Sequence, residues 1–117
     1  MITNKNSLSV RLSAIAERDF QDILRWTAEQ FGRMQARIYA QTISHALQAL
    51  SAGPHAKNVV RRDDIMPGLL LLHVARSGRR GRHFILFRIG TSDTEKYVDV
   101  LRLLHDSMDF VRHLPTE

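Results

Sequence analysis

Reactive polar side chains are densest in the C-terminal stretch Lys96–Pro115. Within it, residues 97–104 are apolar except for Asp99 and Arg102, and this composition predicts a strand that is buried on both faces. An arginine in such a strand must point into a cleft or pair with an acid, because an isolated buried charge is costly. His105 follows at the end of the strand and could supply an imidazole. We therefore expect the rest of the chain to be arranged around this strand.

Ahead of this strand, the apolar patterns predict an N-terminal strand and two helices. The alternation in Ser7–Leu12 is typical of a half-buried edge strand. Ser13 is a good N-cap for an amphipathic helix that ends at Gly32 as a left-handed cap. A second helix begins at Arg33 and is stopped by Gly53-Pro54. The two helices should form a hairpin.

The second half of the chain predicts a meander of three antiparallel strands. Gly68–Arg76 and Arg82–Ile89 have strand patterns, and the basic turn Ser77–Gly81 joins them. After the third strand, a short helix capped by Asp106 or Ser107 should close the fold. The predicted class is α+β: an N-terminal strand, an αα-hairpin, a three-stranded antiparallel meander and a short C-terminal helix.

The composition is that of one globular domain, 1-117, in which residues 1–6 and 115–117 are expected to be flexible. The chain has 117 residues, 44% of them hydrophobic, which suffices for a single core. We place Trp26 and Phe31 in that core. The longest apolar run is far too short to span a bilayer, and a cytoplasmic protein is expected. The net charge of +5 favours an acidic partner or nucleic acid.

We expect no metal and no cofactor. There is no cysteine, so thiolate ligands are excluded. The Gly-flanked arginines of the basic turn do not match the spacing of a phosphate-binding loop. The remaining histidines are scattered, with no pair at a metal-binding spacing: His45, His55, His73, His83 and His113.

Several motifs follow one another from LSAIAERDFQDILRWTAEQFG through QARIYAQTISHALQAL and RHFILFRI to VLRLLHDSMD, or roughly from Leu8 to Leu114. Their order carries a resemblance to the ParE branch of the RelE/ParE superfamily of toxin–antitoxin toxins. Its most specific parts are Asp19, Phe31-Gly32, Pro67-Gly68-Leu69, Arg82-His83, Phe87, Leu104-His105 and Met108-Asp109. Similar sequences often have Gly-Leu-Arg where this chain has Gly68-Leu69-Leu70.

The resemblance implies a small sheet with a helical hairpin on one side and a role as the toxin of a type II system. It implies a cognate antitoxin, ParD-like with a ribbon-helix-helix N-terminus, that wraps the toxin. It also implies DNA gyrase as the target, with nucleic acid reached only indirectly, through gyrase or through the complex at its operator.

The RelE branch of the superfamily is instead a ribosome-dependent endoribonuclease, which is the alternative function. Cleavage through a 2′-OH needs a base, cations and an acid. The possible equivalents in this chain are Arg61, Arg88, Arg102 and His105. No tyrosine follows His105, and the acidic Asp106 beside it would repel a phosphate, so the set is incomplete. We favour an inhibitory binding protein over an enzyme.

If gyrase is the target, the candidate target-binding residues are Arg88, Arg102, His105 and Asp109. The same side chains could instead have structural roles. His105 could be a hydrogen-bonded structural imidazole, and the two arginines could pair inside the protein with Asp99, Asp106 or Asp109. A folded homologue that has lost toxicity is a third possibility.

Overall fold

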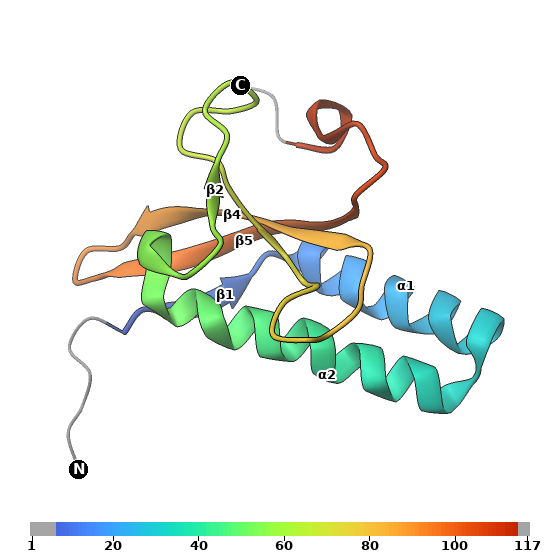
Figure 1. The fold of residues 1–117 in the computed structure, drawn as a ribbon. Helices are drawn as coiled ribbons and strands as arrows, with labels where there is room; N and C mark the ends of the chain where they lie inside the picture. Colours follow the sequence, from blue (N-terminus) through green and yellow to red (C-terminus); the bar gives the residue numbers. More distant parts are fainter. Residues whose placement is uncertain (1–6, 115–117) are drawn as a thin grey trace, which may run out of the picture.

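The computed structural model describes residues 7–114, so the predicted flexibility of 1–6 and 115–117 lies outside the described residues. Its α+β architecture confirms the predicted class (Figure 1). The elements are β1 (Ser9–Leu12), α1 (Ala14–Phe31), α2 (Arg33–Ala49), the 3-10 helix η1 (Leu50–His55), β2 (Val60–Arg61), β3 (Leu70–His73), β4 (His83–Thr91), β5 (Lys96–His105) and the 3-10 helix η2 (Phe110–His113). No helix within residues 7–114 has the length and apolar character that crossing a bilayer requires.

The helical hairpin begins and turns where the sequence predicts. The Ser13 side chain accepts a hydrogen bond from the N–H of Ala16 at 3.0 Å and donates one to the carbonyl of Leu101 at 3.0 Å. The same hydroxyl therefore caps α1 and ties its first turn to β5. At the turn, Gly32 has φ 92° and ψ 166°, a positive-φ extended conformation rather than the predicted left-handed helical one.

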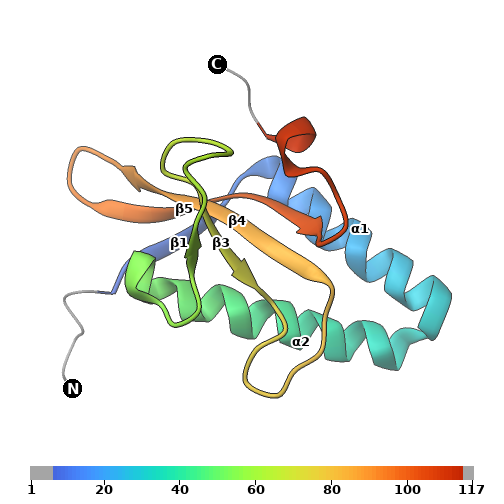
Figure 2. The same ribbon diagram turned by 45° about the horizontal axis from the view of Figure 1, so that its top comes forward.

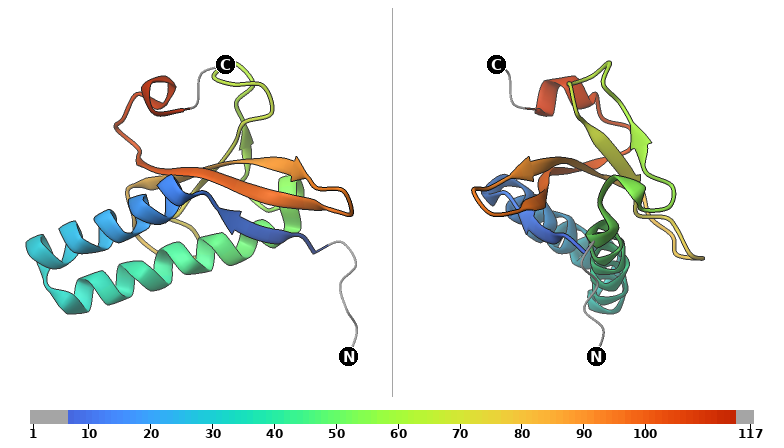
Figure 3. Two further views of the ribbon diagram at one scale, coloured as in Figure 1. Left: turned by 180° about the vertical axis from the view of Figure 1, so that it is seen from behind. Right: turned by 90° about the vertical axis from the view of Figure 1, so that its left-hand side faces the viewer.

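The five strands form one mixed sheet in the order β1-β5-β4-β3-β2. β3, β4 and β5 are the predicted antiparallel meander, β2 extends it, and β1 pairs with β5 in parallel. Both faces of the sheet are covered. The hairpin packs on one face, and the loop after β2 and the C-terminal segment pack on the other (Figure 3). This double burial explains the nearly continuous apolar sequence of β5.

A β-bulge in β5 changes which face its side chains occupy. Leu86 of β4 pairs with Arg102, but the next residue, Phe87, pairs with Val100, so Leu101 is the extra residue. Before the bulge, Val100 faces the helices; after it, the helix side is occupied by an odd-numbered residue, Leu103. The bulge at Leu101 therefore lies directly before Arg102, the arginine of this strand.

Two sequence predictions need correction, one about the core and one about the N-cap of the C-terminal helix. Trp26 and Phe31 are not core residues: their exposed fractions are 56% and 64%. The hairpin extends beyond the end of the sheet (Figure 2), so within residues 7–114 these two side chains stay largely exposed. The short C-terminal helix is present as η2, but its N-cap is Asp109, which accepts from the N–H of Val111, rather than Asp106 or Ser107.

Candidate functional site

A groove of about 610 Å³ lies between the helical hairpin and the loop that joins β3 to β4. Its lining is mostly apolar on the helix side and basic on the loop side. The residues that line it are Trp26, Thr27, Phe31, Gln35, Ile38, Tyr39, Thr42, Gly78, Arg79, Arg80, Gly81, Arg82, His83 and His105. It is the main candidate for the binding of a partner.

The apolar wall of the groove is built by the distal part of the hairpin. The rings of Trp26 and Phe31 contact each other edge to face, with centroids 5.8 Å apart. Ile38 of α2 lines the same groove and is 45% exposed. Three large apolar side chains exposed in one groove are typical of an interaction surface.

The basic rim of the groove comes from the β3–β4 loop. Arg82 is held by Asp106 in a two-pronged ion pair, with N–O distances of 3.1 and 3.2 Å. In contrast, Arg79 and Arg80 make no ion pair within residues 7–114. Their charge is available to an acidic partner in the groove.

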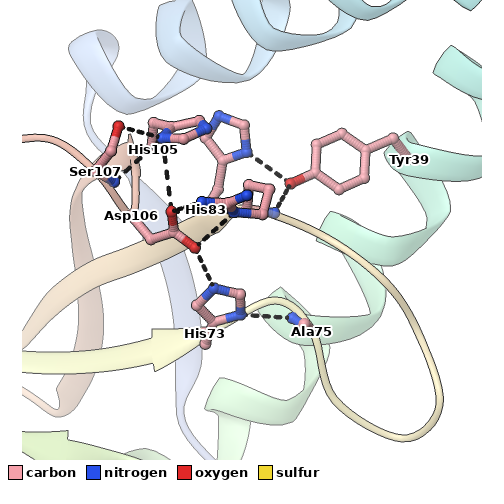
Figure 4. Close-up of polar contacts among 8 residues, drawn as sticks. Tyr39, His73, Ala75, His83, His105, Asp106 and Ser107 are labelled. Atoms are coloured by element: carbon pink, nitrogen blue, oxygen red, sulfur yellow. Dashed lines mark hydrogen bonds and ion pairs between the residues drawn. The ribbon is translucent and has the colours of Figure 1, made fainter.

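A polar cluster lies at the inner end of the groove (Figure 4). The N–H of Arg82 donates to the hydroxyl oxygen of Tyr39 at 3.1 Å, and that hydroxyl lies 2.6 Å from Nδ1 of His83. The phenol oxygen can accept from Arg82 while its hydroxyl donates to Nδ1. The pKa of His83 is lowered to about 4, mainly by burial and next by the nearby His105.

Two further histidines of the cluster are held as the same tautomer. Nδ1 of His73 accepts from the N–H of Ala75 at 3.0 Å, and Nδ1 of His105 accepts from the N–H of Ser107 at 3.1 Å. A nitrogen that accepts from a backbone N–H carries no proton, so the ring proton of each lies on Nε2.

Asp106 connects the ends of three strands. Its carboxylate accepts from Arg82 at the start of β4 and from Nε2 of His73 at the end of β3, the latter at 3.1 Å, while Asp106 itself follows β5. The hydrogen bond from Arg82, then that from His73, lowers the pKa of this carboxyl to about 2. The charge expected to repel a phosphate is therefore neutralised within the protein.

The low pKa of His83 predicts a loss of stability in mild acid. The unfolded state binds a proton at this imidazole below pH 6.5, but the native state does so only below about pH 4. The free energy of unfolding should therefore fall as the pH drops from 6.5 to 4. His83→Gln should reduce this fall, measured as urea midpoints at pH 7 and pH 4.5. The exposed His55→Gln should leave it unchanged, and an equal fall in all three proteins would contradict the assignment.

The four residues considered for a nuclease do not converge, because each is engaged by another group of the protein. Arg61 pairs with Asp63 at 3.2 Å, and Arg88 with Asp99 at 3.2 Å, one of the pairings predicted for it.

Arg102 forms an internal ion pair with a residue that the sequence did not suggest. Its guanidinium donates to both carboxylate oxygens of Asp19 in α1, at 2.8 and 2.9 Å, and to the carbonyl of His113 at 3.0 Å. Asp19 also accepts from the N–H of Leu103 at 3.0 Å. Arg102 thus joins α1, β5 and the C-terminal segment.

His105 has no nitrogen lone pair free to act as a base in this arrangement. Nδ1 accepts from Ser107, and Nε2 carries the proton. Asp109, the remaining candidate, is exposed and caps η2. The imidazole of His105 is hydrogen-bonded to the backbone N–H and the hydroxyl of Ser107.

Sequence reasoning missed the cluster around His83 and the groove beside it. The histidines are far apart in the chain and meet through strand register: His83 pairs with His105, and the two rings lie 5.3 Å apart. The only signal in the sequence was that His83 and His105 lie at the ends of two predicted strands that could pair. No group of three or more metal-ligating side chains within residues 7–114 is arranged to hold an ion.

The element order, the sheet and the hairpin define a small α+β protein compatible with the RelE/ParE-like fold. The sequence profile of the ParE toxin of the type II toxin–antitoxin system parDE matches residues 10–110. The chain therefore belongs to the ParE toxin family and is the toxin component of a type II system, which implies a cognate antitoxin.

Two relatives from different bacteria support this assignment. Toxin ParE1 of Mycobacterium tuberculosis is 30% identical over 103 residues, covering 88% of this chain and 94% of the relative. Toxin ParE1 of Caulobacter vibrioides is 27% identical over 108 residues, covering 89% and 95%.

Proposed function

We propose that this toxin acts in the cytoplasm as a single domain that inhibits DNA gyrase, and that a ParD-like, ribbon-helix-helix antitoxin neutralises it. The observation that carries this proposal is the groove, which suits binding rather than catalysis. An apolar wall beside unpaired arginines matches a protein partner that is both apolar and acidic.

The antitoxin part of the proposal follows from the chemistry of the groove. An amphipathic helix could place its apolar side chains against Trp26, Phe31 and Ile38 while its acidic residues face Arg79 and Arg80. The apolar contact supplies most of the affinity, and the charges mainly accelerate and direct the encounter.

The gyrase part of the proposal is supported by the state of the nuclease candidates. The three arginines of that set are each bound to a carboxylate of the protein, and the imidazole lacks a free lone pair. Cleavage of RNA would need these groups free and aimed at one phosphate. An inhibitor that binds its target needs only a complementary surface.

For the target surface, we propose direct contacts by Arg88, His105 and Asp109. All three have side chains at the surface, with exposed fractions of 46%, 37% and 62%. Arg102, also assigned to target binding on sequence grounds, would contribute by holding the C-terminal segment in place through the carbonyl of His113.

Purified toxin should inhibit supercoiling by gyrase and promote double-strand cleavage of DNA, while mRNA in a programmed ribosome stays intact. The two assays, run on one preparation, separate the candidate functions. Cleavage of ribosome-bound mRNA that is abolished by His105→Ala would favour the endoribonuclease instead. Antitoxin binding with neither activity would indicate a homologue without toxicity.

A further inference from the structure

The strand β1 leaves one edge of the sheet open. Along the parallel pairing with β5, the N–H of Ser13 donates to the carbonyl of Val100 at 3.0 Å. Because backbone groups alternate in direction along a strand, Ser9 and Arg11 also face β5, while Val10 and Leu12 face outward. Within residues 7–114, no hydrogen bond from another element reaches the backbone groups of these two outward residues.

The open edge is short and has a defined beginning. The N–H of Leu8 points to the same side and donates to the carbonyl of Ser51 in η1 at 2.8 Å, so η1 closes the edge there. The free donors and acceptors are those of Val10 and Leu12, at the border of the sheet (Figure 3). An unpaired edge of this kind is a template for another strand.

Two apolar hollows lie beside this edge on the helix side. One, of about 410 Å³, is lined by Val10, Leu12, Leu47, Gln48 and Ser51. The other, of about 480 Å³, is lined by Leu12, Glu17, Phe20, Gln21 and Leu24. Alternate side chains of an added strand would point to this side, and the two hollows would receive them.

On the opposite face of the sheet, β1 presents a positive charge. Arg11 lies over the ring of Tyr97, 4.1 Å from its centroid, and its ion pair with Glu95 is long, at 3.6 Å, and exposed. A residue next to Arg11 on an added strand would therefore be favoured if acidic. A second copy of this chain pairing through β1 would bring two such arginines together, which opposes self-association.

We propose that the free edge of β1 binds an extended segment of the antitoxin as a sixth strand, apolar at alternate positions and acidic between them. This contact is separate from the groove and rests on the proposed function for its partner. The backbone groups of Val10 and Leu12 supply the hydrogen bonds, and the two hollows and Arg11 select the side chains.

Amide hydrogen exchange, followed by NMR, tests the proposal without altering the fold. The probe is the purified cognate antitoxin, added to purified toxin. The amides of Val10 and Leu12 should exchange readily in free toxin and at least tenfold more slowly in the complex. Equal exchange in a complex that forms and neutralises would overturn this proposal alone, and failure of the antitoxin to bind would overturn the proposed function as well.

A pair of charge reversals gives a second, independent readout. Arg11→Glu should weaken antitoxin binding about tenfold. Arg25→Glu makes the same change of charge in an exposed ion pair of α1 and should alter the dissociation constant less than twofold. Equal effects of the two variants, or protection of Val10 and Leu12 in free toxin that grows with its concentration, would overturn the proposal, the latter in favour of self-pairing.

Discussion

Arg102→Ala is expected to lower the free energy of unfolding by roughly 3–5 kcal/mol, the cost of breaking a buried ion pair. The substitution leaves the carboxylate of Asp19, which is 13% exposed, without its guanidinium. It also removes the hydrogen bond to the carbonyl of His113. Because a folded domain is stable by only about 5–15 kcal/mol, thermal melting should detect the change directly.

Arg88→Ala is the matched control, since it removes an arginine from an ion pair on the neighbouring strand. That pair is 46% exposed on its arginine side and should contribute about 1 kcal/mol or less. A melting temperature of Arg102→Ala equal to that of the parent, combined with loss of growth inhibition, would show that Arg102 contacts the target and does not stabilise the fold.

Ile38→Asp is expected to raise the dissociation constant for the antitoxin about 100-fold. The substitution removes an apolar side chain from the wall of the groove and places a negative charge where an acidic segment should bind. A 100-fold change corresponds to about 2.8 kcal/mol. Titration calorimetry measures it, and the parent complex should show a negative heat-capacity change because apolar surface is buried.

Ile15→Asp is the control for this substitution. Ile15 is also an exposed helical isoleucine, 54% against 45% for Ile38, but it does not line the groove. Both variants should melt close to the parent, since neither side chain is in the core. Equal losses of affinity in the two variants would show that the antitoxin does not bind in the groove. Binding that vanishes at moderate salt with no heat-capacity change would exclude an apolar interface altogether.

Local signals in the sequence predicted the elements well because each signal acts within a few residues. Ser13 caps α1 through its own side chain, Gly32 separates the two helices, and the apolar run of β5 becomes a strand buried on both faces. The order of these elements then restricts the topology to a hairpin packed on a meander. The boundaries of β3 were less accurate: Gly68–Arg76 was predicted and Leu70–His73 is observed.

The tertiary structure alone decided which polar and apolar side chains meet. Asp19 pairs with Arg102 from 83 positions away, at a bulge that no periodicity reveals. Phe31 has the spacing of a core residue, but the spacing marks only a helix face and does not show that the sheet ends before it. His83 and His105 meet through register between strands. Long-range pairing depends on the packing of whole elements, so the groove, its polar cluster and the open edge of β1 emerge only once the chain has folded.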